Sequence, residues 1–261
     1  MATSAARGAD HRLGRVLLTV GVLGGALVLL HALGRYAFDY ALVWGQGSYA
    51  ERLGKGLLLT LGISVGGMIV AIALGALGAA GRVSRRWVPN QLAAIYVEVV
   101  RGTPFLVQIL VVWYGLRPVL RSQGWPDVVV GDVPLAVWTL GAFGGAYVTE
   151  IIRGALESVP RGQVEAARAQ GLTAAQAMRH VVLPQALPAM VPALTGQLVN
   201  LVKDSSLFSV VAVMELMKEA RAVVANTYAA FEVYVPLAFL YLAITFPLGR
   251  LARRLEAQTA A

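Results

Sequence analysis

The chain contains no cysteine and only three histidines. Without cysteine there can be no disulfides, thiolate zinc sites, iron–sulfur clusters or cysteine nucleophile. His11, His31 and His180 lie too far apart in sequence to form a metal-ligand motif. The phosphate-binding pattern G-x-x-x-x-G-K-[ST] is also missing, so any nucleotide hydrolysis that the chain depends on must come from another protein. We therefore expect no catalytic site, no metal and no cofactor in this chain.

Charge is scarce and apolar residues dominate the composition. Of 261 residues, 57% are hydrophobic and 14% are charged, and the mean hydropathy is +0.67. These values predict an all-α protein that crosses a membrane several times. Crossing a hydrocarbon core of about 30 Å takes about 20 apolar residues. Six stretches are candidates: 16–33, 56–80, 93–116, 134–152, 186–202 and 233–249.

The first stretch also has features of a secretory signal peptide, because a basic segment precedes it. No convincing small-residue cleavage site follows it, and the apolar run is longer than is usual for a signal peptide. We expect it to be a membrane anchor.

The basic residues are distributed unevenly between alternate loops. Thirteen of the 22 Lys and Arg residues fall in the N-terminal tail, the loops after the second and fourth spans, and the C-terminus, together with four acids. The other loops hold eight Lys and Arg residues and eight acids. The positive-inside rule therefore places both termini in the cytoplasm. Because topology explains the net charge of +8, we expect no nucleic-acid binding.

The second span is rich in glycine and contains a G-x-x-x-G pattern at Gly62 and Gly66. Small residues let membrane helices approach closely, which predicts a position inside the helix bundle. The same residues, with Ser64 between them, also match the G-x-S-x-G of serine hydrolases. That motif needs a strand-to-helix turn and a histidine base, and no later span contains a histidine. An intramembrane serine protease is therefore a remote alternative.

The loop between the fourth and fifth spans predicts two short helices. Pro160 is placed to start the first and Gly171 to end it in a left-handed conformation. Thr173 and Gln176 match a capping box, and the second helix is expected to run to Pro184. Both helices carry apolar residues that indicate a docking partner: Val164, Ala167, Met178, Val181 and Val182.

Two further interpretations of the sequence involve different partners. The helix pair is similar to a DNA-binding helix-turn-helix, but such modules need a third helix for their core. An ion-coupled secondary transporter or channel would work without ATP; such carriers usually show repeated sets of helices, and no internal repeat is evident here.

Specific spacings in this loop match a known pattern. Glu165-Ala166-Ala167 is followed after three residues by Gly171, after nine more by Val181, and then by Leu183-Pro184. This arrangement resembles the EAA loop of permease subunits of bacterial ABC importers, although that pattern prefers Ile at the position of Val181. Segments 96–104, 145–154 and 200–207 resemble the branch that takes up polar amino acids.

The resemblance implies a type I ABC importer-like transmembrane domain with five core helices, to which this chain adds one N-terminal helix. It divides the chain into residues 1–55 (tail, first helix and external loop), the permease domain 56–251 with a cytoplasmic coupling loop at 153–185, and a C-terminal tail 252–261. The implied function is import of polar amino acids across the bacterial inner membrane by alternating access. The implied contacts with the ATPase are Glu165, Ala166, Ala167, Gly171, Leu183 and Pro184.

The resemblance also implies several partners. These are two ATP-binding cassette subunits that bind ATP and magnesium, an extracytoplasmic amino-acid-binding protein, and a second permease copy, identical or related, within the lipid membrane.

Ionisable residues inside the predicted spans are costly unless they are paired or hydrated, so each marks a candidate functional site. Glu98 and Arg101 in the third span should lie at a depth similar to that of Glu150 and Arg153 in the fourth. One interpretation is a structural ion-pair network among these four residues. The other is that Glu98, Arg101 and Thr103 line the route of a zwitterionic amino acid, beside a helix kinked by Pro104.

A second polar cluster follows the fifth span. We expect a non-helical break or partial re-entry there, because the next apolar piece is too short to cross a membrane. It would line a cavity; the alternative is an ordinary solvated helix end. The residues proposed for the route are Asn200, Lys203, Asp204 and Ser205.

Overall fold

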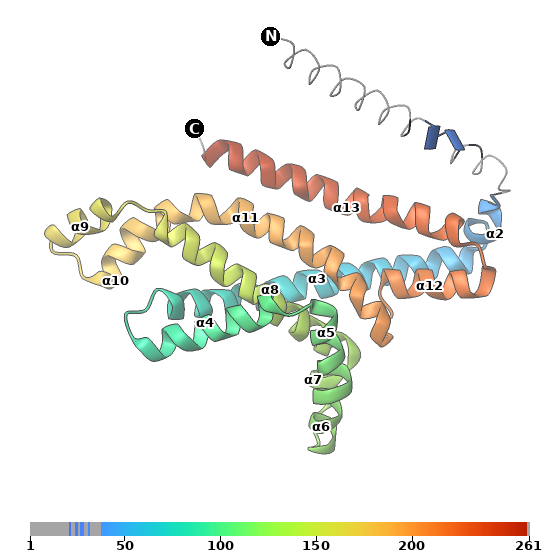
Figure 1. Cartoon of the computed structure of the whole chain (residues 1–261), viewed down its shortest axis with the longest axis horizontal. Helices are drawn as coiled ribbons and strands as arrows, with labels where there is room; N and C mark the ends of the chain where they lie inside the picture. Colours follow the sequence, from blue (N-terminus) through green and yellow to red (C-terminus); the bar gives the residue numbers. More distant parts are fainter. Residues whose placement is uncertain (1–20, 22–23, 26, 29–30, 32–37, 260–261) are drawn as a thin grey trace, which may run out of the picture. The chain divides into compact units, whose positions relative to one another are not determined.

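The computed structural model describes residues 21, 24–25, 27–28, 31 and 38–259. The chain divides into two compact units, Met1–Ala41 and Leu42–Ala261. The predicted first span, residues 16–33, falls largely outside the described residues. α2 begins two residues before the second unit, which contains α3 to α13 (Figure 1).

The described part of the chain is helical and contains no strand. The helices are α2 (Tyr40–Trp44), α3 (Gly47–Arg82), α4 (Trp87–Gly102), α5 (Phe105–Leu110), the π-helical η1 (Val111–Leu116), α6 (Arg117–Ser122), α7 (Asp127–Val130), α8 (Asp132–Glu157), α9 (Arg161–Ala169), α10 (Ala174–Ala177), the π-helical η2 (Met178–Val182), α11 (Leu183–Asp204), the 3₁₀ helix η3 (Ser205–Val211), α12 (Leu216–Thr227) and α13 (Ala230–Thr259).

Five helical segments of this part are long and apolar enough to cross a membrane: Gly47–Arg82, Phe105–Ser122, Asp132–Glu157, Ala174–Val211 and Ala230–Ala257. The second, fourth, fifth and sixth predicted spans all fall within these segments, and the remaining segment, Phe105–Ser122, overlaps the third predicted span, so the five core helices are confirmed. The observed helices are longer at one or both ends, because a helix can continue past the bilayer into polar residues that a search for charge-free stretches cuts off.

The third predicted span, 93–116, is wrong as a single kinked helix. α4 ends at Gly102, Thr103 and Pro104 are extended (ψ 144° and 134°), and a new helix starts at Phe105 in another direction (Figure 1). Proline disfavours helical geometry in the residue before it and removes one backbone donor. The Gln108 side chain donates to the freed carbonyl of Val100 at 2.7 Å and to the Thr103 hydroxyl at 2.9 Å.

α3 and α8 pack closely along their length. A Cβ at Gly75 would lie 2.4 Å from the Val148 side chain, and one at Gly141 would lie 2.5 Å from Val70. Close approach of this kind was expected of the glycine-rich second span, but a Cβ at Gly62 of its G-x-x-x-G pattern would meet no atom within 4 Å. Ser64 is fully buried and donates to the Thr60 carbonyl at 2.7 Å, as a packing residue does and a catalytic serine does not.

The central core joins α3, α5, η1, α8, α11 and η3. Its middle is aromatic: the rings of Phe105 and Phe143 stack with centroids 4.1 Å apart, and Phe208 meets Phe105 edge-on at 5.8 Å. Such pairs add specific geometry to apolar burial. The helix that restarts after Pro104 is thereby fixed against α8 and η3.

The segment after α11 also differs from expectation. The chain stays helical through Asp204 and tightens into η3, which is followed by Ala212 with φ of +66°. The non-helical break predicted at 200–206 is therefore wrong, because the run 174–211 forms a single helical segment, whereas the partial re-entry stays a prediction. After it comes α12, a helix that was not expected from the sequence.

Candidate functional site

The loop between α8 and α11 has the local structure that the sequence predicts. α9 begins directly after Pro160, Gly171 has φ of +89°, and Thr173 and Gln176 form a complete capping box. The second helix, however, does not stop at Pro184. A π-helical turn at Met178–Val182 leads directly into α11, and Pro184 lies in the first turn of α11.

Four of the five apolar residues of this loop pack inward, and the fifth, Val181, is half-buried. Val182 packs in a cluster with Ala155, Val159 and Ala186, and Val164 and Met178 contact that cluster. Ala167 is only 6% exposed. The surface of the loop is formed by other residues, including Glu165, Ala166, Gly171 and Pro184, while Leu183 is half-buried. The Val164 side chain of α9 packs against this cluster, and α9 also contacts η2 and α10.

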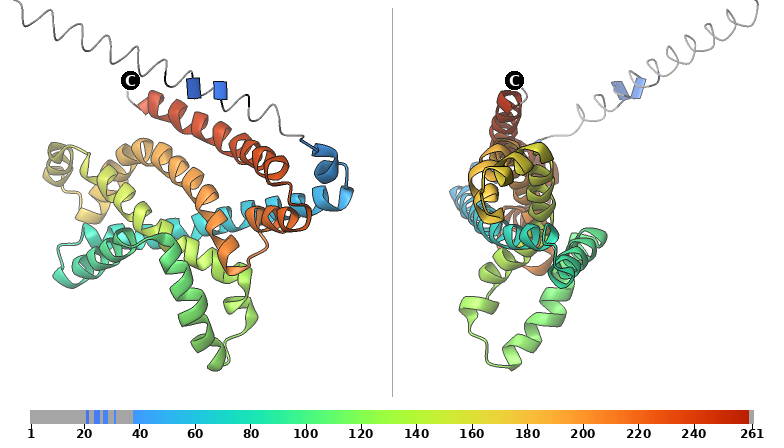
Figure 2. Two further views of the ribbon diagram at one scale, coloured as in Figure 1. Left: turned by 45° about the vertical axis from the view of Figure 1, so that its right-hand side comes forward. Right: turned by 90° about the vertical axis from the view of Figure 1, so that its left-hand side faces the viewer.

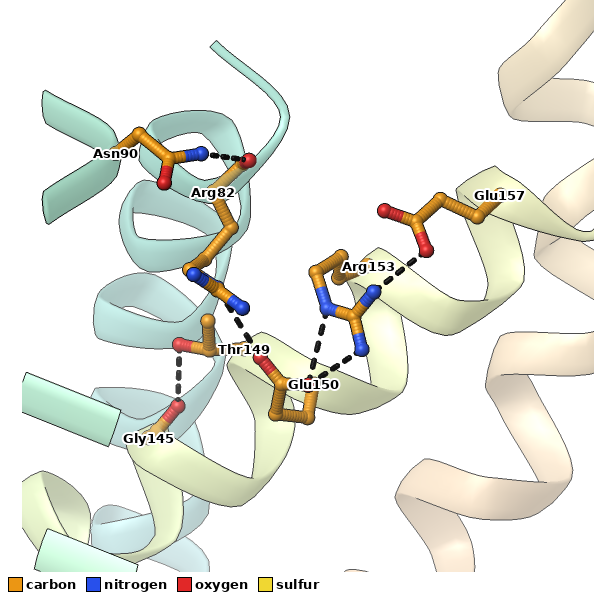
Figure 3. Close-up of polar contacts among 7 residues, drawn as sticks. All are labelled: Arg82, Asn90, Gly145, Thr149, Glu150, Arg153 and Glu157. Carbon is orange, nitrogen blue, oxygen red and sulfur yellow. Dashed lines mark hydrogen bonds and ion pairs between the residues drawn. The ribbon is translucent and has the colours of Figure 1, made fainter. Parts of the chain in front are cut away.

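Ion pairs connect the ends of α3 and α8 near this loop (Figure 3). Glu150 accepts from Arg153 at 2.7 Å and lies 3.5 Å from Arg82 of α3; Arg153 also contacts Glu157. Of the network expected among Glu98, Arg101, Glu150 and Arg153, only the Glu150–Arg153 pair forms in the described part of the chain. Arg82 supplies the charge from the neighbouring helix instead.

Arg101 and Glu98, both exposed, have other surroundings. The Arg101 guanidinium lies 5.1 Å from the centre of the Tyr147 ring, a cation–π arrangement. No ion pair to Glu98 occurs in the described part of the chain. The Thr103 hydroxyl donates to the Val99 carbonyl at 2.9 Å.

A polar cavity of about 370 Å³ lies between α8 and α11. Three predicted residues line it, namely Asn200, Lys203 and Asp204. The fourth, Ser205, is fully buried and donates to the Val202 carbonyl at 2.8 Å. The cavity combines one cation, one carboxylate, two amides and two aromatic rings, a set that can hold a small zwitterion; its remaining lining residues are Phe143, Tyr147 and Gln197.

Those three remaining lining residues were not predicted from the sequence. Gln197, Asn200 and Asp204 are spaced i, i+3 and i+7, the spacing of one helix face, so a helix predicted through position 204 would have included Gln197. Phe143 and Tyr147 are four residues apart on α8 but belong to a run rich in apolar residues. Nothing local distinguishes them from core residues.

The opposite end of the spans contains a buried polar cluster around Glu215. This carboxylate is fully buried and caps α12 by accepting from the backbone N–H groups of Met217 (2.9 Å) and Lys218 (2.7 Å). The hydroxyls of Thr60 and Tyr241 each lie 3.4 Å from it. Burial raises the pKa of Glu215 to about 7, and the hydrogen bonds only partly oppose this. The cluster ties α12 to α3 and α13.

No group of three or more His, Asp or Glu residues that could hold a metal ion occurs in the described ranges. The fold and site together are those of a membrane transport subunit: a helical bundle with a polar cavity between two of its spans and an exposed, rigid helix between the same two spans.

Comparison with known proteins defines this class further. The model of the family of binding-protein-dependent transport system inner membrane components matches residues 67–260, and the chain belongs to this family. Its members are permease subunits of ABC transporters, and the all-α architecture is that of a type I ABC importer permease.

Individual relatives agree with this assignment. The chain is 35% identical over 219 residues to the glutamine transport system permease protein GlnP of Escherichia coli K12, covering 84% of this chain and 96% of that protein. It is 38% identical over 208 residues to the octopine transport system permease protein OccM of Rhizobium meliloti, covering 77% and 83%. A crystal structure of an amino acid ABC transporter with histidines superposes with a TM-score of 0.74 at 31% identity, covering 85% of this chain and all of that one.

Proposed function

We propose that this chain is the membrane-spanning subunit of an ATP-driven importer that moves polar amino acids across the bacterial inner membrane by alternating access. Its partners are a pair of ATP-hydrolysing subunits on the cytoplasmic side, an amino-acid-binding protein on the other side, and a second permease copy. Both termini lie in the cytoplasm, where α9 contacts the ATPase. ATP and magnesium are bound by the ATPase.

One observation carries the proposal. The helices that flank the α9 loop, α8 and α11, are also the two walls of the polar cavity. Because the loop is packed against both helices through its apolar cluster, a displacement of α9 must move both walls. Motion delivered at Glu165, Ala166 and Gly171 can therefore open or close the cavity without any covalent chemistry in this chain.

The cavity is proposed as part of the substrate route. Lys203 can pair with an α-carboxylate and Asp204 with an α-ammonium group, since charge-assisted hydrogen bonds are the strong ones in such sites. Gln197 and Asn200 offer amide donors and acceptors for a polar side chain. The relatives named for glutamine and octopine, and a solved amino acid transporter, support polar amino acids as the substrate class.

Arg101 lies beside this route, next to Tyr147. Glu98, Thr103 and Ser205 do not line the cavity, and we leave them out of the proposed route.

The test is a pair of matched proline substitutions at the two glycines with positive φ among the described residues, Gly171 (+89°) and Gly124 (+79°). Each glycine N–H donates at 3.0 Å to a carbonyl of the preceding helix, at Arg168 and Arg121 respectively. Proline removes that donor and fixes φ near −65°. In the reconstituted complex, Gly171→Pro should abolish binding-protein-stimulated ATP hydrolysis, and Gly124→Pro should leave it intact. Normal stimulation in Gly171→Pro would refute the coupling role.

A further inference from the structure

Helices α4 and α5 meet at a sharp bend and run on in different directions (Figures 1 and 2). Pro104 has no backbone donor, and no backbone hydrogen bond joins α5 to α4 among the residues that the structure describes. One side chain closes the bend instead. The amide nitrogen of Gln108 donates to the Val100 carbonyl at 2.7 Å, to the Thr103 hydroxyl at 2.9 Å and to the Thr103 carbonyl at 3.2 Å. In this part of the chain, Gln108 therefore supplies all the hydrogen bonds between α5 and the end of α4.

These contacts exceed what is needed to cover one exposed carbonyl. A single bond from Gln108 to Val100 would satisfy the carbonyl that Pro104 leaves free. The Thr103 hydroxyl, which accepts from Gln108, donates in turn to the Val99 carbonyl at 2.9 Å. Hydrogen bonds linked in this way strengthen one another. The linked bonds fix the angle between the two helices.

Residues on both sides of the bend hold aromatic rings of α8. Before the bend, the Arg101 guanidinium lies 5.1 Å from the centre of the Tyr147 ring. After the bend, Phe105, the first residue of α5, stacks on Phe143 with ring centroids 4.1 Å apart. Phe143 and Tyr147 are themselves 5.1 Å apart and line the polar cavity, so we call them the aromatic wall. The position of this wall therefore depends on the angle of the bend.

Phe105 also contacts the other side of the cavity. Its ring meets Phe208 of η3 edge-on at 5.8 Å. η3 continues α11, whose residues Asn200 and Lys203 line the cavity opposite the aromatic wall. A change in the α4–α5 angle would move Phe105 relative to both helices that enclose the cavity.

We infer that Gln108 is a positioning residue for the polar cavity. By fixing the α4–α5 bend, it keeps Arg101 and Phe105 against the aromatic wall and so maintains the shape of the cavity. Gln108 itself lines no part of the cavity. The consequence for transport rests on the proposed function, in which this cavity is part of the amino-acid route.

A purely structural role for Gln108 makes a different prediction, and Asn90 provides the matched control. The Asn90 side-chain amide also donates to a carbonyl at the end of a helix, that of Arg82 in α3 (Figure 3). Asn90 does not line the cavity. If covering a carbonyl were the whole role of Gln108, Gln108→Met and Asn90→Leu would both lower the thermal stability and leave the cavity unchanged.

The first measurement reports access to the cavity. Because the chain has no cysteine, Asn200→Cys places one thiol per copy in the cavity lining. The rate at which methanethiosulfonate ethylammonium modifies this thiol is followed by mass spectrometry of the chain, in the intact importer complex without nucleotide. Gln108→Met should raise the rate about fivefold, the population shift expected from losing one such hydrogen bond. Asn90→Leu should leave the rate unchanged.

The second measurement reports the bend. Nitroxide labels at Ile95→Cys in α4 and Val119→Cys in α6, both exposed, give a distance across it by pulsed electron paramagnetic resonance. Labelled chain is diluted with unlabelled chain so that one copy per complex carries labels. The distance distribution should broaden in Gln108→Met and stay narrow in Asn90→Leu. Phe105→Leu keeps the Gln108 bonds but removes the ring that stacks on the wall, so it should raise the thiol rate with the distance unchanged.

Three results would overturn the inference. They are an unchanged distance distribution in Gln108→Met, a changed distribution with an unchanged thiol rate, and equal changes in Gln108→Met and Asn90→Leu. A separate result tests the proposed function: free glutamine should slow modification of Asn200→Cys. If it does not, the cavity is not part of the amino-acid route, whereas the dependence of its shape on Gln108 is still decided by the other measurements.

Discussion

Charged residues are exposed at one end of the membrane spans and buried at the other. At the α9 end, Glu165 and three arginines (Arg85, Arg161 and Arg168) are exposed, and the loop is held by an apolar cluster beneath them. At the α12 end, Glu215 and Glu219 are buried, with Arg52 donating to Glu219 at 2.8 Å. Exposed charge on a rigid support is available to partners, whereas buried and hydrogen-bonded charge fixes geometry. We infer that α9 transmits motion and that α12 belongs to a fixed frame.

The largest expected difference between the ends concerns coupling. Glu165→Lys reverses an exposed charge on α9 and should lower binding-protein-stimulated ATP hydrolysis by at least about tenfold, which corresponds to roughly 1.4 kcal/mol at the contact. Asp127→Lys reverses a carboxylate that is also exposed, on α7, where it pairs with Arg121 at 3.1 Å. That control should keep normal stimulation. Equal losses in both variants, measured in the same reconstituted complex, would contradict a special role for α9.

The second prediction compares stability, since each end of the spans contains a helix cap whose removal should lower the free energy of unfolding. Glu215→Ala removes a buried cap and leaves backbone donors and the Thr60 hydroxyl short of a partner, at a cost of about 3 kcal/mol in unfolding free energy. Thr173→Ala removes an exposed cap, from α10, at a cost of about 1 kcal/mol. Thermal unfolding in detergent at pH 5.5 measures both. If Thr173→Ala is the more destabilising change, the inference that α12 belongs to a fixed frame is wrong.

The Glu215 carboxyl should also make stability depend on pH. Its pKa is raised to about 7 from an ordinary value of 4.5, so between these values the folded state binds more protons than the unfolded state. The free energy of unfolding should therefore fall as pH rises from about 4.5 to 7, by roughly 2–3 kcal/mol at most. Glu215→Gln should remove this dependence and should be more stable than the unmodified chain at pH 8. A profile that is unchanged in the variant would exclude Glu215 as its source.

The smallest expected effect concerns Arg101, which lies beside the polar cavity, next to Tyr147. Arg101→Ala removes the guanidinium next to Tyr147, a contact of about 0.5–1 kcal/mol, and should lower amino-acid uptake by a few-fold without changing assembly of the complex. Arg101→Lys should recover part of the uptake. Uptake assays and size-exclusion chromatography separate the two effects, and loss of assembly in Arg101→Ala would instead indicate a structural role.

Prediction from sequence succeeds where the cause is local. Pro160, Gly171 and the Thr173–Gln176 box define both ends of α9 and the start of α10 through their own backbone and side-chain chemistry, and the structure confirms all three. Prediction from sequence fails where a residue far away in the chain determines which contact forms. Arg82 rather than Arg101 pairs with Glu150, and the Gln108 side chain covers the carbonyl that Pro104 frees.

The amino-acid sequence by itself determined that this chain crosses a membrane, where four of the five described spans lie, and how the α9 loop folds, since apolar length and capping act over a few residues. Only the tertiary structure decided which side chains share the polar cavity, which arginines converge beside α9, and that Glu215 is buried. These depend on how helices far apart in the chain pack together, and no short stretch of sequence encodes that packing.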